Sequence, residues 1–102
     1  MQAGVAIQVL PQGSESTETL RIIDAVICSI RERFPDADVG PFETTIEGAY
    51  DECMEMLADC AQIAAREGAG EVAVYAKVFY SPTAGVMTTE EKTGKYRLGD
   101  GR

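Results

Sequence analysis

Residues 50–67, with the sequence YDECMEMLADCAQIAARE, decide the fold. Their apolar side chains recur every three or four positions and so share one face of an α-helix. The predicted face consists of Tyr50, Cys53, Met54, Leu57, Cys60, Ala61 and Ala64. Gly68 and Gly70 follow, and glycines at this place are typical of the end of a helix. The sequence therefore predicts an amphipathic helix over residues 50–67.

The segments on both sides of this helix have the pattern of β-strands. Residues 71–80, EVAVYAKVFY, place apolar side chains at every second position, which is the period of a strand. Residues 44–48, TTIEG, contain a Thr-Thr-Ile core of the β-branched type that strands favour. The predicted helix is thus flanked by a strand before it and a strand after it.

The N-terminal half repeats this plan. Residues 4–10 alternate as a strand that Pro11 and Gly13 are predicted to end. The hydroxyl and acidic side chains of residues 14–18 suit the start of a helix, with a hydroxyl group as its N-cap. This helix runs to about residue 33, before Pro35. Its apolar stripe comprises Leu20, Ile23, Val26, Ile27, Ile30 and Phe34. Residues 37–41 are predicted as a short strand, which its proline restricts to a sheet edge.

The predicted element order is βαββαβ, which is the order of a ferredoxin-like α+β domain. Right-handed crossovers then give a four-stranded antiparallel sheet of order 4-1-3-2 with both helices on one face. A chain of 102 residues suits one domain. We expect residues 1–82 to form it, followed by an appendix over residues 83–102 with a short helix from residue 88 and a frayed end.

Two helices cover only one face of such a sheet, so the other face is left open. Strand alternation assigns Val5, Ile7, Val9, Ile46, Val72, Val74 and Val78 to the helix side. The open face then carries Ala6, Gln8, Leu10, Thr45, Glu47, Tyr75, Lys77 and Phe79. A face of such mixed polarity is typical of an oligomer interface or a ligand site. Gln8, Thr45 and Glu47 fall on the two central strands, where they could converge on one ligand.

Each of these open-face features also has a purely structural interpretation. Glu47 and Lys77 could form an ordinary salt bridge across the sheet, which contributes about 0–1 kcal/mol when exposed. Thr44 and Thr45 could be present only for their β-propensity. Tyr75 and Phe79 are more often packed in an interface than stacked on a ligand ring.

Composition excludes several classes of protein. The net charge is -8 and no run of Lys or Arg occurs, which disfavours nucleic acid and anionic membranes as partners. The N-terminus lacks the basic region of a signal peptide, and no apolar run approaches the ~20 residues of a membrane span. We therefore expect a cytoplasmic protein. Cys28, Cys53 and Cys60 are expected to be small buried side chains in a reducing compartment.

The residues typical of catalysis and metal binding are missing from the sequence. The chain has no histidine, which is the usual general base and the commonest metal ligand. No nucleophile elbow, phosphate-binding loop, dinucleotide fingerprint or zinc-protease motif occurs. We therefore predict no catalytic residue, no metal site and no enzyme.

Several blocks of sequence resemble one known family. They are Val39-Gly40-Pro41-Phe42-Glu43-Thr44-Thr45-Ile46-Glu47-Gly48 running into Tyr50-Asp51-Glu52, the opening Ile7-Gln8-Val9-Leu10-Pro11, and Lys77-Val78-Phe79-Tyr80-Ser81-Pro82 followed by Thr88-Thr89-Glu90-Glu91-Lys92 and Lys95-Tyr96-Arg97. Together they are similar to the YkoF-like thiamine/hydroxymethylpyrimidine-binding family over nearly the whole chain.

This resemblance implies a ferredoxin-like domain that forms homodimers or homotetramers through its sheets. It also implies that the protein binds thiamine or its hydroxymethylpyrimidine half as a carrier or in salvage, with no other cofactor. The implied ligand residues are Gln8, Thr44, Thr45 and Glu47, joined by Tyr80 and Ser81. Their amide, hydroxyl and carboxylate groups match the donors and acceptors of an aminopyrimidine.

A thiazolium cation would favour an aromatic face such as Tyr75 or Tyr80. Lys77 on the same surface opposes a cation there unless Glu47 neutralises it. Two other functions stay open. The first is a structural or regulatory module that associates with protein partners through the open face. The second is a small enzyme acting on a pyrimidine, with Glu47 as acid or base.

Overall fold

Six elements follow one another in the computed structural model of the chain: β1 (Ala3–Gln12), α1 (Ser16–Arg33), β2 (Asp38–Val39), β3 (Thr44–Gly48), α2 (Tyr50–Arg66) and β4 (Glu71–Tyr80). The structure describes residues 2–13, 15–82, 87 and 91. The predicted βαββαβ order is confirmed. The short helix and frayed end expected in the appendix fall, apart from residue 91, outside the described residues.

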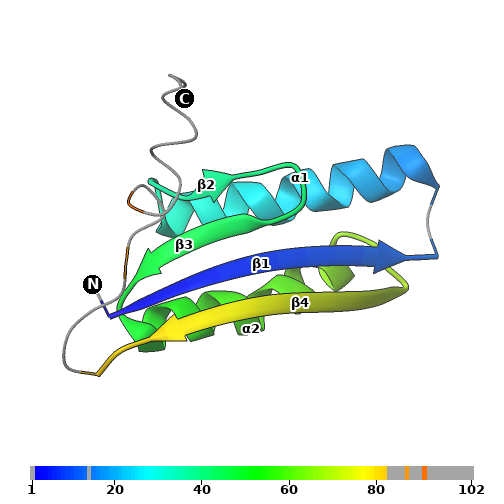
Figure 1. Ribbon diagram of the computed structural model, residues 1–102. Helices are drawn as coiled ribbons and strands as arrows, with labels where there is room; N and C mark the ends of the chain where they lie inside the picture. The colour runs from blue at the N-terminus through cyan, green and yellow to red at the C-terminus, as the bar shows by residue number, and fades with distance from the viewer. Residues whose placement is uncertain (1, 14, 83–86, 88–90, 92–102) are drawn as a thin grey trace, which may run out of the picture.

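All four strands form one antiparallel sheet in the order β2-β3-β1-β4, which is the predicted 4-1-3-2 order read from the other edge. Both helices lie on the same side of this sheet (Figure 1). The chain therefore has the predicted α+β architecture, with one sheet face covered by helices and the other left open by the part of the chain that the structure describes. Neither of these two described helices is long and apolar enough to cross a membrane.

The strands differ in length, and this difference shapes the molecule. β1 pairs with β4 along its whole length, from Ala3 opposite Tyr80 to Gln12 opposite Glu71. Its pairing with β3 ends where Ile7 lies opposite Thr44. Residues 8–12, which we call the β1 extension, have β4 on one side and no described strand on the other. Pro11 lies inside β1, where we expected it to end the strand, because a residue without an N–H is tolerated at such an edge.

The core fills the space between the sheet and the two helices. It consists of Val5, Ile7, Ile22, Val26, Ile30, Ile46, Cys53, Met56, Cys60, Ile63 and Ala64. The predicted helix faces are partly wrong: Leu20 is 61 % exposed, whereas Ile22, which was not on the predicted stripe, is buried. In α2, Met56 is buried in place of Met54. Adjacent apolar residues give each helix a broad apolar arc, and packing against the sheet selects its centre.

Two further local predictions are wrong. α1 begins after Glu15, and no side-chain hydrogen bond caps it there, in place of the expected hydroxyl cap. Cys28 is exposed, whereas Cys53 and Cys60 are buried as predicted. Cys28 lies two positions after the buried Val26 and two before the buried Ile30, so the helix turns it away from the core.

Candidate functional site

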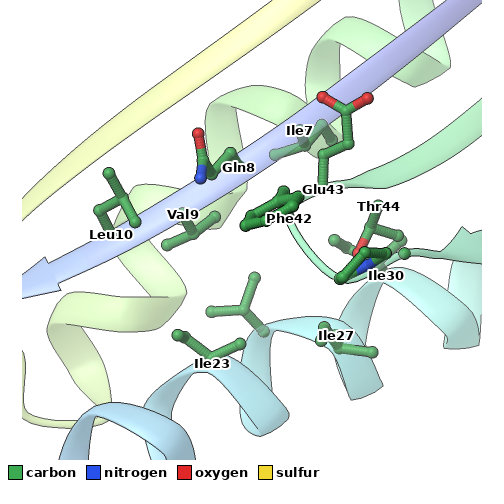
Figure 2. Close-up of a pocket in the computed structure, with 13 residues that line it drawn as sticks. Ile7, Gln8, Val9, Leu10, Ile23, Ile27, Ile30, Phe42, Glu43 and Thr44 are labelled. Carbon is green, nitrogen blue, oxygen red and sulfur yellow. The ribbon is translucent and has the colours of Figure 1, made fainter.

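A pocket of about 270 Å³ lies between the β1 extension and α1 (Figure 2). Three segments line it. β1 contributes Ile7, Gln8, Val9 and Leu10, α1 contributes Ile23, Val26, Ile27 and Ile30, and the chain between β2 and β3 contributes Gly40, Pro41, Phe42 and Glu43, followed by Thr44 of β3. The pocket occupies the place that a longer β3 would fill.

The turn between β2 and β3 forms one wall of the pocket. The Gly40 N–H donates a hydrogen bond to the Glu43 carbonyl oxygen at 2.9 Å, which closes the turn. A Cβ atom at position 40 would lie only 3.1 Å from that same oxygen, so a larger residue there would require the turn to shift by a few tenths of an ångström. Phe42 of this turn lines the pocket (Figure 2) and is largely exposed, at 78%. The tight turn therefore holds an aromatic ring beside the pocket.

The pocket is apolar on its α1 side and polar at a few points around its rim. Ile23, Ile27 and Ile30 project from α1 toward β1 (Figure 2). The polar side chains that line the pocket are those of Gln8, Glu43 and Thr44. Thr44 is only 5 % exposed and lies on the helix side, opposite the buried Ile7. A concave apolar surface with a few polar groups is the usual composition of a small-molecule site.

Glu43 connects the pocket to the open face of the sheet. Its carboxylate points away from α1 (Figure 2), and its Oε1 lies 3.3 Å from the Nζ atom of Lys77 on β4. Lys77 lies opposite Ala6 of β1, so the ion pair crosses β1 above a small side chain. The sequence suggested Glu47 as the partner of Lys77. The structure instead pairs Lys77 with Glu43.

The predicted open-face residues do lie on one face, but they are spread along it. Gln8 lies directly opposite Tyr75, Thr45 opposite Ala6, and Glu47 opposite Gly4. Four positions separate Gly4 from Gln8, or about 13 Å along a strand. The structure therefore places Gln8 and Thr44 at the pocket, Thr45 and Tyr75 beside it on the open face, and Glu47 farther away.

Glu47 belongs to a second hollow, of about 330 Å³, at the end of α1 and the start of α2. Its lining is more polar and includes Arg33, Asp36, Glu47 and Glu52. This hollow and the pocket have no described lining residue in common, so Glu47 and Gln8 line different recesses.

Tyr80 and Ser81 lie at the end of the sheet remote from the pocket. Tyr80 is opposite Ala3, and its ring packs on that of Tyr50 with the centroids 4.6 Å apart and the planes tilted by 52°. The Ser81 N–H donates a hydrogen bond to the Gln2 carbonyl oxygen at 3.1 Å. In the described structure these contacts tie the end of β4 to the start of β1 and of α2.

Sequence reasoning did not assign ligand roles to Phe42, Glu43 or the isoleucines of α1. A signal for them was present, because the predicted strand over residues 44–48 is shorter than the one over residues 4–10. A sheet built from unequal strands leaves the longer one unpaired at one end. The Gly-Pro-Phe-Glu segment that precedes Thr44 is the chain available to cover that gap.

Groups for metal binding or thiol chemistry do not gather at the pocket. Among the residues that the structure describes, no cluster of three or more potential metal ligands occurs. Burial raises the pKa of the Cys60 thiol to about 11 and also raises the pKa of Cys53. Both thiols are therefore protonated and unreactive near neutral pH. The arrangement at the pocket is suited to holding an uncharged or weakly polar ring.

Comparison with known proteins gives consistent matches along most of the chain. A family model described as "Thiamine-binding protein" matches residues 5–97. A UPF0045 protein of Clostridium perfringens is 38% identical over 93 residues, which are 91% of this chain and 95% of that protein.

Solved structures give the same result. A domain of unknown function from Bacillus cereus has a TM-score of 0.84 at 31% identity, covering 96% of this chain and 92% of that one. A candidate thiamine biosynthesis/salvage protein of Thermotoga maritima has a TM-score of 0.82 at 30% identity, covering 95% of this chain and 100% of that one.

Proposed function

This chain belongs to the thiamine-binding protein family, and on that premise we propose that it binds thiamine, or the hydroxymethylpyrimidine half of thiamine, without catalysing a reaction. The observation that carries this proposal is the pocket between the β1 extension and α1. The proposed role of the protein is that of a carrier or salvage protein for the vitamin.

The size and lining of the pocket favour one ring of the ligand. Ligand sites usually measure about 300–1,000 Å³, so a pocket of about 270 Å³ is slightly smaller than that range. It suits a single substituted ring better than both rings of thiamine. One face of an aminopyrimidine would pack on Ile23 and Ile27, with the Thr44 hydroxyl on the same side of the sheet as a hydrogen-bond partner. The Gln8 amide belongs to the open face and would meet the ring at the rim, around the unpaired edge of β1.

The thiazolium ring would then lie at the mouth of the pocket, toward the open face of the sheet. Tyr75 does not line the pocket, but it is directly opposite Gln8 on the open face and is exposed. The face of an aromatic ring attracts a cation, so Tyr75 is the proposed contact for this half of the ligand. Thr45, which is opposite Ala6 on the same face, is the neighbouring polar group.

We also propose that copies of the chain associate through the open face. Tyr75 and Phe79 are large, exposed and on the same side of β4, and an exposed apolar surface of this kind favours a protein contact. Such association would place part of a second copy near the pocket mouth. Light scattering of the purified protein measures the size of the assembly directly, and Tyr75→Ser is expected to reduce it.

Thermal unfolding with and without ligand tests the proposed function. Ligand at 100 times its dissociation constant adds about 2.7 kcal/mol to stability, which raises the midpoint by several degrees. Ile27→Trp fills the pocket and is expected to abolish this rise. Leu20→Trp adds the same ring at an exposed site of the same helix and should leave the rise intact. If the ligand still raises the unfolding midpoint of Ile27→Trp, the ligand binds outside this pocket.

A second pair of variants distinguishes the pocket from the hollow that contains Glu47. Binding in the pocket predicts that Thr44→Val weakens affinity and that Glu47→Ala does not. The reverse pattern would assign the ligand to the hollow at the end of α1. Absence of any shift with either compound at millimolar concentration would favour the alternative function, a protein-interaction module that uses the exposed aromatic side chains of β4.

A further inference from the structure

We propose that Lys77 sets the charge selectivity of the pocket, although Lys77 does not line it. By pairing with Glu43, Lys77 neutralises the mouth, so that the pocket accepts an uncharged ring and does not draw in a cation. This inference rests on the proposed function, because it concerns the same pocket. It adds a residue outside the lining that sets how strongly cationic and uncharged ligands are distinguished.

The charge inventory of the pocket is short. Among the described residues that line it, Glu43 is the only one with an ionisable side chain. The chain as a whole carries a net charge of -8, so its average field attracts cations. Without a partner, the Glu43 carboxylate would add a local attraction for a thiazolium or ammonium group at the entrance.

Lys77 removes that local attraction. Its Nζ atom lies 3.3 Å from Glu43 Oε1, and Glu43 is the less exposed partner, at 37% against 74% for Lys77. The carboxylate is therefore partly sheltered while its positive partner faces solvent. A cation that approaches the pocket meets Lys77 as well as Glu43, and the two contributions oppose each other.

The sheet register explains why Lys77 can occupy this position. Lys77 is opposite Ala6, and Ala6 is opposite Thr45, which lies two positions after Glu43 in the chain. The methyl group of Ala6 leaves room for both long side chains to meet above β1. The ion pair thus connects β4 to the turn that forms the pocket wall, across one intervening strand.

An ordinary surface ion pair makes a different prediction. It would contribute a small amount to stability, and its removal would change the affinity for charged and uncharged ligands by the same factor. Charge selectivity requires instead that only the affinity for the cationic ligand changes. The ratio of the two affinities is therefore the quantity to measure.

Calorimetric titration with thiamine and with its pyrimidine alcohol, at low salt and at a pH where the pyrimidine is uncharged, gives this ratio. Lys77→Met should bind thiamine about fivefold more tightly, because the Glu43 carboxylate is no longer neutralised. Affinity for the uncharged pyrimidine should change by less than about twofold, since no ligand charge meets Glu43. Lys77→Arg keeps the charge and should restore the wild-type ratio.

Two controls separate the charge effect from other causes. Arg66→Gln removes one positive charge from a residue that does not line the pocket, and it should leave the ratio unchanged. Glu43→Gln combined with Lys77→Met should abolish the gain for thiamine. Light scattering checks that the assembly keeps its size in each variant.

The possible results are distinguishable. If the wild-type protein binds neither compound, the proposed function fails, and this inference fails with it. If the wild-type protein binds but Lys77→Met leaves the ratio unchanged, or shifts both affinities equally, the proposed function stands and the role of Lys77 is refuted. A gain confined to thiamine that disappears at high salt supports the inference.

Discussion

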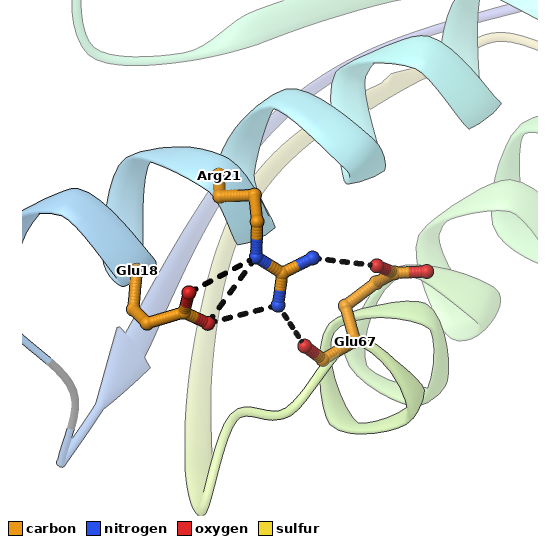
Figure 3. Close-up of polar contacts among 3 residues, drawn as sticks. All are labelled: Glu18, Arg21 and Glu67. Atoms are coloured by element: carbon orange, nitrogen blue, oxygen red, sulfur yellow. Dashed lines mark hydrogen bonds and ion pairs between the residues drawn. The ribbon is translucent and has the colours of Figure 1, made fainter.

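Arg21 of α1 donates a hydrogen bond to the backbone carbonyl oxygen of Glu67, the residue that caps the C-terminal end of α2 (Figure 3). The same guanidinium contacts the Glu67 carboxylate at 3.0 Å and the Glu18 carboxylate at 2.9 Å. One side chain therefore links the first turns of α1 to the last turn of α2. It also meets a carbonyl of the kind left without an intrahelical partner at a helix end.

Replacing Arg21 by Met should lower the free energy of unfolding. Hydrogen bonds to Glu18 and Glu67 raise the pKa of Arg21, so the guanidinium is charged at neutral pH and both ion pairs are present there. The contacts are exposed, so the loss should shrink as salt is added. Urea unfolding at two ionic strengths measures both effects. Arg66→Met is the control, and an equal loss there would show that any helix arginine stabilises the fold similarly.

Met56→Ala should be far more damaging than Met54→Ala, although the two residues are two positions apart. Met56 is fully buried between α2 and the sheet, whereas Met54 is only partly buried. Truncation of a buried methionine costs about 2–5 kcal/mol. Denaturant unfolding of the two variants gives the difference directly. Similar losses would mean that the face of α2 predicted from the sequence is the one that packs.

Gly40→Ala should weaken ligand binding while leaving most of the stability intact. The added Cβ would lie 3.1 Å from the Glu43 carbonyl oxygen, so the turn that carries Phe42 and Glu43 would have to shift. Gly70→Ala is the matched control, since its Cβ would meet only the Gln12 carbonyl oxygen at an ordinary 4.0 Å. Calorimetric titration of both variants tests this expectation. Unchanged ligand affinity in Gly40→Ala would show that this turn does not contribute to the binding site.

The Cys60 thiol should make the fold less stable in alkaline solution. Burial raises its pKa from 9.0 to about 11, so the folded state holds the thiol proton more tightly than the unfolded state does. The resulting stabilisation is fully present below the unfolded pKa of 9.0 and is lost as pH rises through about 11. Urea unfolding at several pH values should show a steeper alkaline decline in the parent protein than in Cys60→Ala. Parallel curves for the two proteins would contradict this assignment.

Most of the architecture could be predicted from the sequence, because strand alternation and helix periodicity are local signals. The bounds of β4 match the predicted residues 71–80, and those of β3 match residues 44–48. The buried face of α1 was predicted less accurately than the strands. Ile22 and Ile23 are adjacent, and only contact with the sheet determines which of the two is fully buried.

The pocket was harder to predict because it depends on register. Alternation alone places Thr44 and Thr45 on opposite faces of the sheet, whereas the family resemblance assigned both residues to one ligand site. The relation between Ile7 and Thr44, beyond which β1 has no β3 partner, follows from strand pairing that no single segment specifies. Glu43 lines the pocket because the pairing of β1 with β3 ends at the neighbouring residue, Thr44.

Because β3 begins only at Thr44, the length of the backbone between β2 and β3 helps to set the dimensions of the cavity, together with the side chains that line it. Adding residues between Gly40 and Thr44, or extending the hairpin by one pair, would reshape the recess without replacing a core residue such as Ile22 or Met56, neither of which lines it. A lineage of such chains can therefore acquire new small-molecule preferences through insertions and deletions in one short connection, at little risk to folding.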